Sequence, residues 1–394
     1  MSAEIKRRVW EAVQAWSGPA RELAQDILAH PEIGYRETRA SRLLGQALAG
    51  EGFEVQQPFG GLDTAFCART SPEGSPRIAF LAEYDALPEI GHGCGHNLIG
   101  PAAAAAAVGV SRVLDQVGGS LAVIGTPAEE YLGEEEGKVK LLRAGAFRGV
   151  DAALMLHPAT ERQVLGSDLG FIACELIFRG ESAHAAADPW NGRNALDGLL
   201  SAFQNINALR QQLRPEVRVH GIITEGGRAP NIIPELTRAQ FMVRAPHPDM
   251  LDEVYERVCD CAAAGAVASG TDLEVRRITT VYNTRINPTL NRLIENNFHE
   301  LGETVTAPPL HMSASSDFGN VSQQLPAAMF LIDSHPEDIP WHSRRTAQAS
   351  GEEKALAEMI RGACVLAGTA VDLLAEPELL GEAKKEFETH GQHA

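Results

Sequence analysis

Three short apolar runs, separated by Ala-rich or Leu-rich helical stretches, constrain the fold of this chain most. They cover residues 77–81, 120–125 and 152–156 and have the composition of buried strands. Strands that alternate with helices predict a mostly parallel sheet. In such sheets the functional residues gather at the carboxyl ends of the strands. The sequence therefore predicts an α/β domain whose chemistry lies in the loops that follow these three runs.

The pattern changes between residues 167 and 283. The predicted elements there are a strand at 171–178, a helix at 194–212, strands at 217–223 and 237–245, a helix at 250–268 and a strand at 272–281. This βαββαβ order is typical of a ferredoxin-like α+β domain. The first pattern resumes later, with an apolar run at 327–332 and a long helix at 351–373. We therefore predict a discontinuous first domain of residues 1–166 and 284–394, and an inserted domain of residues 167–283.

The length and the charge of the chain limit the number of domains and the kinds of partner that we expect. A chain of 394 residues favours two domains over one core. The formal net charge of −18 disfavours nucleic acid and anionic membranes as partners. The six cysteines lack framework spacing, and the N-terminal segment lacks the apolar stretch of a signal peptide. We therefore expect a cytoplasmic protein with neither a nucleic-acid nor a membrane partner.

Cys94 and His96 are one residue apart in the Gly-rich segment GHGCGHN. Glycine lets the backbone turn so that both side chains can face one ion. Thiolate and imidazole suit zinc and other late transition metals. A buried cysteine and a hydrogen-bonded histidine are the common alternative. The pair therefore indicates a metal site only if further ligands converge on it.

Glu129 and Glu130 follow the second apolar run, in GTPAEE. Adjacent carboxylates repel each other, so a nearby cation stabilises them. Neighbouring residues at a strand end point in different directions. One glutamate can therefore bind a metal while the other acts as a general base towards a water. A solvated acidic loop is the alternative, and it describes residues 134–136 better.

Further candidate ligands follow the other apolar runs. His157 comes directly after the third run, and Asp85 can orient a ligand histidine. His335 and His342 both follow the run at 327–332, and spacing does not decide between them.

Two candidates belong to the inserted domain. The context of His184, FRGESAHAAADPW, favours a helix-capping region over a role in polarising a substrate carbonyl. Arg228 is a candidate anchor for a substrate carboxylate, although a surface position is the commoner role of arginine.

Seven segments resemble a known family in the expected order. They are residues 30–37, 82–100, 125–130, 157–160, 180–197, 229–235 and 313–322. The chain resembles the dinuclear metallopeptidases that include aminoacylase, glutamate carboxypeptidase and hippurate hydrolase. Within them it is most similar to the amidohydrolase branch with a metal-binding cysteine, which includes p-aminobenzoyl-glutamate hydrolase and the β-alanyl-lysine type dipeptidases.

The resemblance implies a set of metal ligands. Cys94 would bridge two divalent ions, with His96 and His157 on one ion and Glu130 and His342 on the other. Mn²⁺ or Zn²⁺ is the expected metal. The late motif HPEDIPWHSRRTAQAS departs from the common form of the branch, so one ion and two ions both remain open.

The resemblance also implies roles outside the metal ligands. Glu129 would be the general base. The inserted domain would be a lid that also forms a homodimer or a higher homo-oligomer. His184 would then reach the partner subunit's site and stabilise the oxyanion, which reverses the interpretation from its own context. Asn231 would help to bind the substrate carboxylate or the oxyanion.

The expected activity is metal-dependent hydrolysis of the amide C–N bond of a small N-acyl amino acid, dipeptide or aryl amide. Two alternatives stay open. The same site could hydrolyse a non-amide C–N bond, as in aryl amine deamination or carbamoyl hydrolysis. The scaffold could also be a metal-binding protein without catalytic activity.

Overall fold

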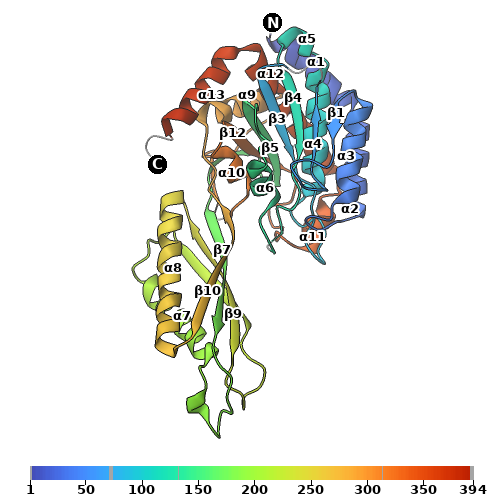
Figure 1. Cartoon of the computed structure of the whole chain (residues 1–394). Coiled ribbons are helices and arrows are strands. Elements are labelled where there is room, and N and C mark those ends of the chain that lie inside the picture. Colours follow the sequence, from blue (N-terminus) through green and yellow to red (C-terminus); the bar gives the residue numbers. More distant parts are fainter. Residues whose placement is uncertain (1, 71–73, 132, 313, 391–394) are drawn as a thin grey trace.

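The computed structural model describes residues 2–70, 74–131, 133–312 and 314–390. Figure 1 shows a larger domain, which contains the first and last helices, and a smaller domain that extends from one side of it. The larger domain is built on an eight-stranded sheet with the order β1-β2-β4-β3-β5-β12-β6-β11, and the smaller one on a four-stranded sheet with the order β10-β7-β9-β8. The predicted fold class, a mostly parallel α/β domain with an α+β insert, is confirmed.

The centre of the large sheet is parallel, because β4, β3, β5 and β12 are parallel neighbours. The strands of this sheet are β1 (Glu54–Gln56), β2 (Phe66–Arg69), β3 (Arg77–Ala82), β4 (Ser120–Gly125), β5 (Ala152–Ala159), β6 (Gln163–Ser167), β11 (Leu310–His311) and β12 (Ala327–Asp333). Helices cover the central strands, which explains why these strands are continuous apolar runs and do not alternate. The three runs predicted as strands are β3, β4 and β5.

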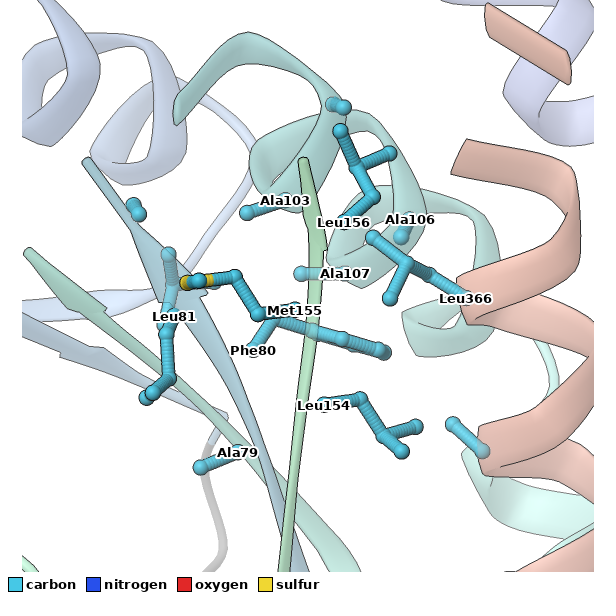
Figure 2. Packing of buried hydrophobic residues seen from close by; sticks show 14 of the residues in the cluster. Ala79, Phe80, Leu81, Ala103, Ala106, Ala107, Leu154, Met155, Leu156 and Leu366 are labelled. Carbon is cyan, nitrogen blue, oxygen red and sulfur yellow. The ribbon is translucent and has the colours of Figure 1, made fainter. Parts of the chain in front are cut away.

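The helices of the larger domain are α1 (Ser2–Ala15), α2 (Ser17–Ala29), α3 (Thr38–Gly50), α4 (His96–Ser111), α5 (Leu114–Val117), α6 (Gly137–Arg143), α9 (Pro288–Glu300), α10 (Phe318–Ser322), α11 (Arg344–Ala349), α12 (Glu353–Ala375) and α13 (Pro377–His390). The Ala-rich helix α4 contacts β3, β4 and β5, and α12 packs against α4 and β12. Figure 2 shows Ala103, Ala106 and Ala107 of α4 facing Phe80 and Leu156 of the sheet. Alanine on α4 allows this close approach, and burial of each Phe or Leu contributes about 2 kcal/mol.

Both ends of the chain are helical in the described residues. The N-terminal helices α1 and α2 are separated at Trp16, which forms the N-cap of α2. The segment that begins at Pro377 forms the helix α13. Leu380 and Ala383 of α13 are buried, and Asn287 donates a hydrogen bond to the Ala383 carbonyl at 2.8 Å. Tertiary packing therefore stabilises a helix whose sequence is mostly polar.

The smaller domain has the predicted βαββαβ order. Its elements are β7 (Gly170–Arg179), a short 3₁₀ helix (Pro189–Asn191), α7 (Ala195–Arg210), β8 (Arg218–Glu225), β9 (Leu236–Ala245), α8 (Pro248–Ser269) and β10 (Asp272–Val281). Both long helices lie on one face of the antiparallel sheet (Figure 1).

Two chain segments link the domains, one before β7 and one after β10. Asp168 joins them, because its carboxylate accepts hydrogen bonds from the amide and the hydroxyl of Thr284, both at 2.5 Å. The domain limits at residues 167 and 283 stay a prediction. None of the helices in the described part of the chain is long and apolar enough to cross a membrane.

Candidate metal centre

The carboxyl edge of the large sheet brings most of the predicted site residues together. Glu83 and Asp85 follow β3, and Glu129 and Glu130 follow β4. His157 lies near the end of β5 itself. His342 lies in the loop that follows β12, before α11.

Cys94 and His96 lie on either side of a glycine with a left-handed backbone. Gly95 has a φ of 73° and forms the N-cap of α4, and His96 is the first residue of that helix. A Cβ atom at Gly95 would lie 2.9 Å from Pro158 Cγ, so a larger residue would also meet a steric clash. Glycine is therefore required here, as expected from the sequence. The loop places Cys94 Sγ 3.6 Å from His157 Nε2.

The hydrogen bonds of two histidines leave one ring nitrogen of each available to a metal. His157 Nδ1 lies 2.8 Å from the Pro158 carbonyl, which can only accept, so Nδ1 carries the hydrogen and Nε2 carries a lone pair. His96 Nδ1 lies 2.9 Å from Asp85 Oδ1. With Nδ1 held by the carboxylate, Nε2 is the His96 nitrogen that a metal can bind.

Glu130 and His342 form a second group around the same thiol. His342 Nε2 lies 3.4 Å from Glu130 Oε1. The His342 amide donates to the Gly93 carbonyl at 3.1 Å, and its φ of 57° is unusual for a residue other than glycine. Left-handed backbone of this kind costs of the order of 1 kcal/mol and concentrates at functional sites. The second carboxylate oxygen of Asp85 accepts from the Glu130 amide at 2.9 Å.

Two ligand groups therefore share Cys94. The first group is Cys94, His96 and His157, and the second group is Cys94, Glu130 and His342. Within each group the potential ligand atoms all lie within 4.8 Å of one another. Sulfur, imidazole and carboxylate donors in this combination suit zinc and other borderline metals.

Buried polar atoms without partners also fit a bound cation. His96 Nε2 and Glu130 Oε1 have no hydrogen-bond partner among the described residues. Burial raises the pKa of Glu129 well above its ordinary value, and the neighbouring Glu83 and Glu130 raise it further. Burial and Glu130 likewise raise the pKa of the Cys94 thiol. A divalent cation would offset this repulsion and favour the thiolate.

His335 does not belong to the cluster. It is fully buried, and both ring nitrogens already have partners. Nδ1 lies 2.8 Å from Ser334 Oγ, and Nε2 lies 3.0 Å from Ser350 Oγ. Burial lowers the pKa of His335 to about 4, so it stays neutral. The structure therefore places His342, and not His335, beside the candidate ligands.

Glu129 lies directly beside the cluster, and its side chain is only 12% exposed. Its Oε2 atom lies 3.9 Å from His96 Nε2. The preceding residue, Ala128, has a φ of 60° and donates its amide to Glu37 Oε1 at 2.8 Å. Glu129 lines a cavity of about 470 Å³, which is large enough for a small substrate.

The same cavity contains an arginine that no sequence motif singled out. Arg244, near the end of β9, lines it together with Phe171 and Met242 of the smaller domain. The guanidinium lies 5.3 Å from the centre of the Phe171 ring and donates to Ser315 Oγ at 2.9 Å. No carboxylate pairs with Arg244 within the described residues. Its position at the strand end next to the domain linkers is the signal that could have identified it.

The structure does not bring His184, Asn231 or Arg228 to the cluster of the same chain. All three belong to loops at the end of the smaller domain that carries Arg179, the last residue of β7. The ten residues of β7 separate that end from the linkers by about 33 Å. His184 Nδ1 accepts from the Ala186 and Ala187 amides at 3.2 and 3.1 Å, so Nε2 carries the hydrogen and can donate.

Comparisons with known proteins agree with this architecture. A model of peptidase family M20/M25/M40 matches residues 79–370. The chain is 37% identical to Xaa-Arg dipeptidase from Mus musculus over 402 residues, which cover 97% of this chain and 92% of that protein. It is 30% identical to a component of p-aminobenzoyl-glutamate hydrolase from Escherichia coli K12 over 461 residues, with coverage of 98% and 95%.

A solved structure has the same fold. A dinuclear metal-binding peptidase of the M20 family from Bacillus subtilis superposes with a TM-score of 0.66 at 20% identity, over 91% of this chain and 99% of that one. The family match covers more than half of the chain, and the sequence relatives cover nearly all of it. The chain therefore belongs to peptidase family M20/M25/M40 and is a metal-dependent hydrolase of amide C–N bonds.

Proposed function

We propose that this enzyme hydrolyses the amide bond of a small N-acyl amino acid, dipeptide or aryl amide, with two divalent ions held by the groups that share Cys94. The observation that carries this proposal is the pair of three-residue groups around one thiol, with Glu129 directly beside them. In this assignment Cys94, His96 and His157 would hold one ion, and Cys94, Glu130 and His342 would hold the other.

Divalent ions in these positions would supply Lewis acidity, which lowers the pKa of a water towards about 7. Glu129 takes the proton of the attacking water and later returns it to the leaving nitrogen. Its own carboxylate is not needed as a ligand, because each group contains three other donors. Asp85 holds His96 and the Glu130 backbone in place, so it orients the cluster without touching the substrate.

Arg244 is the candidate anchor for the carboxylate of the substrate. Its guanidinium lines the same cavity as Glu129 and lacks a carboxylate partner among the described residues. A bidentate guanidinium–carboxylate pair would fix the distance between the substrate's carboxylate and its scissile amide. This role fits the relatives, since the name of one specifies a dipeptide and that of the other a glutamate conjugate.

A homodimer would bring His184 and Asn231 to the site of a second copy. In their own chain they lie at the far end of the smaller domain. Strand β8 is an edge strand in the described sheet, and Ile222 and Ile223 on it are 64% and 41% exposed. Exposed apolar side chains on an unpaired edge favour addition of a partner's strand. His184 Nε2 would then donate a hydrogen bond to the developing oxyanion, and Asn231 would contact the substrate.

A reducing, cytoplasmic location fits the thiols. Cys94, Cys174, Cys259, Cys261 and Cys364 are free cysteines. Cys94 must stay reduced to bind metal.

A substrate panel tests the proposal. The metal-free protein is reloaded with Mn²⁺ or Zn²⁺ and assayed with N-acyl amino acids, dipeptides including Xaa-Arg peptides, and p-aminobenzoyl-glutamate. Metal content is measured on the same samples. We expect turnover with one amide class, a free carboxylate as product, and two metal equivalents per chain. Release of ammonia without a new carboxylate would identify a non-amide C–N bond as the target. Metal binding without turnover of any substrate would contradict a catalytic role.

A further inference from the structure

A fully buried lysine lies beside the candidate metal ligands. Lys138 is in the first turn of α6 and is inaccessible to solvent. Its ammonium contacts Asp317 Oδ1 and lies 2.6 Å from Glu83 Oε1. Its amide also donates to Asp317 Oδ2, at 2.9 Å. Burying an unpaired ammonium is strongly unfavourable, so a buried lysine needs paired carboxylates of this kind.

The carboxylates around Lys138 have the arrangement of a cation site. Oxygen atoms of Glu83, Glu129 and Asp317 all lie within 4.8 Å of one another, and the side chains of Glu83 and Asp317 are completely buried. Glu83 Oε2 has no hydrogen-bond partner among the described residues and lies 3.5 Å from His96 Nε2, the nitrogen that faces the metal cluster. A hard divalent cation prefers such a set of carboxylate oxygens.

We propose that the Lys138 ammonium is the resident cation of a third carboxylate site, formed by Glu83, Glu129 and Asp317, and that it keeps a third divalent ion out of the centre. This inference rests on the proposed function, because the other two positions are the groups that share Cys94. Lys138 is thus a positioning residue: it holds Glu83 and Asp317 beside the proposed base, Glu129, without contacting the substrate.

The electrostatics support a permanent charge on Lys138. Burial by itself lowers the pKa of an ammonium, but Asp317 and Glu83 outweigh burial and raise the pKa of Lys138 above its ordinary value. Three ionised carboxylates around one point repel one another strongly at low dielectric constant. One tethered ammonium offsets part of this repulsion even when no metal is present. A divalent ion in the same place would carry twice the charge and would compete for Glu129.

Metal stoichiometry tests the proposal without using activity. Wild type, Lys138→Ala and Lys138→Met are stripped with a chelator, titrated with Mn²⁺ by calorimetry, and analysed by mass spectrometry of bound metal after desalting. Lys138→Ala removes the charge and opens the space, whereas Lys138→Met removes the charge and keeps the space filled. We expect two equivalents in wild type, three in Lys138→Ala and two in Lys138→Met. Lys138→Ala with Glu83→Gln should return to two equivalents.

The outcomes separate this inference from the proposed function. Fewer than two equivalents in wild type would contradict the proposed two-ion centre itself. Two equivalents in wild type and in Lys138→Ala, with unchanged affinity, would overturn the third site alone. If Lys138→Ala is unfolded after stripping, we expect Mn²⁺ to restore its native circular dichroism. No recovery, while the charge-balanced variant Lys138→Met with Asp317→Asn folds normally, would also overturn the proposal.

Discussion

Asp85 connects the two candidate metal groups, because one of its oxygens accepts from His96 Nδ1 and the other accepts from the Glu130 amide, both at 2.9 Å. Its carboxylate therefore orients a histidine of one group and a glutamate of the other. Among the described residues, no other carboxylate bonds to both.

Replacing Asp85 should weaken metal binding without removing a ligand. A residue that hydrogen-bonds to a metal ligand typically contributes 10- to 100-fold to the metal affinity. We expect Asp85→Ala to lose Mn²⁺ or Zn²⁺ about 10- to 100-fold more readily in a competition titration with a chelator. Asp85→Asn, which keeps the shape but loses the charge, should lie between this variant and wild type. Affinity equal to wild type in both variants would contradict the orienting role.

His342 and His335 make a matched pair of variants. His342 is half-exposed and close to Glu130, so His342→Ala should lower bound metal by about one equivalent and leave stability nearly unchanged. His335 is buried and hydrogen-bonded through both nitrogens, so His335→Ala should lower the free energy of unfolding by about 1–3 kcal/mol. Metal content and urea unfolding of the two variants show which of the two histidines is the metal ligand. The opposite pattern would make His335 the ligand.

Arg244 should determine the affinity for substrates with a free carboxylate. Leaving a buried charge unpaired costs about 2–4 kcal/mol, so we expect kcat/KM of Arg244→Met to fall about 30- to 1,000-fold. An amide-capped substrate should show little difference between the variant and wild type. Arg238→Met is the matched control, because Arg238 lies on the same strand and pairs with Glu175 and Glu225. An equal loss of kcat/KM for substrates with a free carboxylate and for substrates with an amide-capped carboxylate would argue against carboxylate binding by Arg244.

Subunit mixing tests whether His184 serves the partner subunit's site. Glu129→Gln and His184→Ala should each be almost inactive alone. In a mixed dimer, one site combines an intact Glu129 with an intact His184 from the other chain. Random exchange of subunits should therefore restore about one quarter of wild-type activity. Activity no higher than the sum of the two separate variants would exclude this arrangement.

The four central strands of the large sheet could be predicted from the sequence, and so could the meeting of several candidate site residues, whereas β1, β2, β6 and β11 were not predicted. Continuous apolar runs identify β3, β4 and β5, and the shared edge of parallel strands explains why Asp85, Glu129 and His157 meet. The order of elements in the smaller domain was also predictable, because its strands and helices have the usual lengths and periodicities.

Other features depend on packing that local sequence does not specify. Lys138 lies in the charged stretch EEEGKVK, which resembles a solvated surface, yet it is buried where α6 packs beside α10 and where Glu83 follows β3. Arg244 lies on a strand face that alternates as a solvated face would, yet it lines the cavity. The choice between His335 and His342 depends on one left-handed residue, since φ at His342 brings its ring to Glu130.

The substitution Glu129→Gln tests whether Glu129 is the general base. The variant keeps the shape of the side chain and all five proposed ligands. Turnover and bound metal are measured on the same preparation, with Glu130→Gln as the matched control. We expect Glu129→Gln to retain wild-type metal content and to lose at least about 100-fold in kcat, whereas Glu130→Gln should lose metal as well. Loss of metal from Glu129→Gln, or turnover close to wild type, would contradict the role of Glu129 as the base.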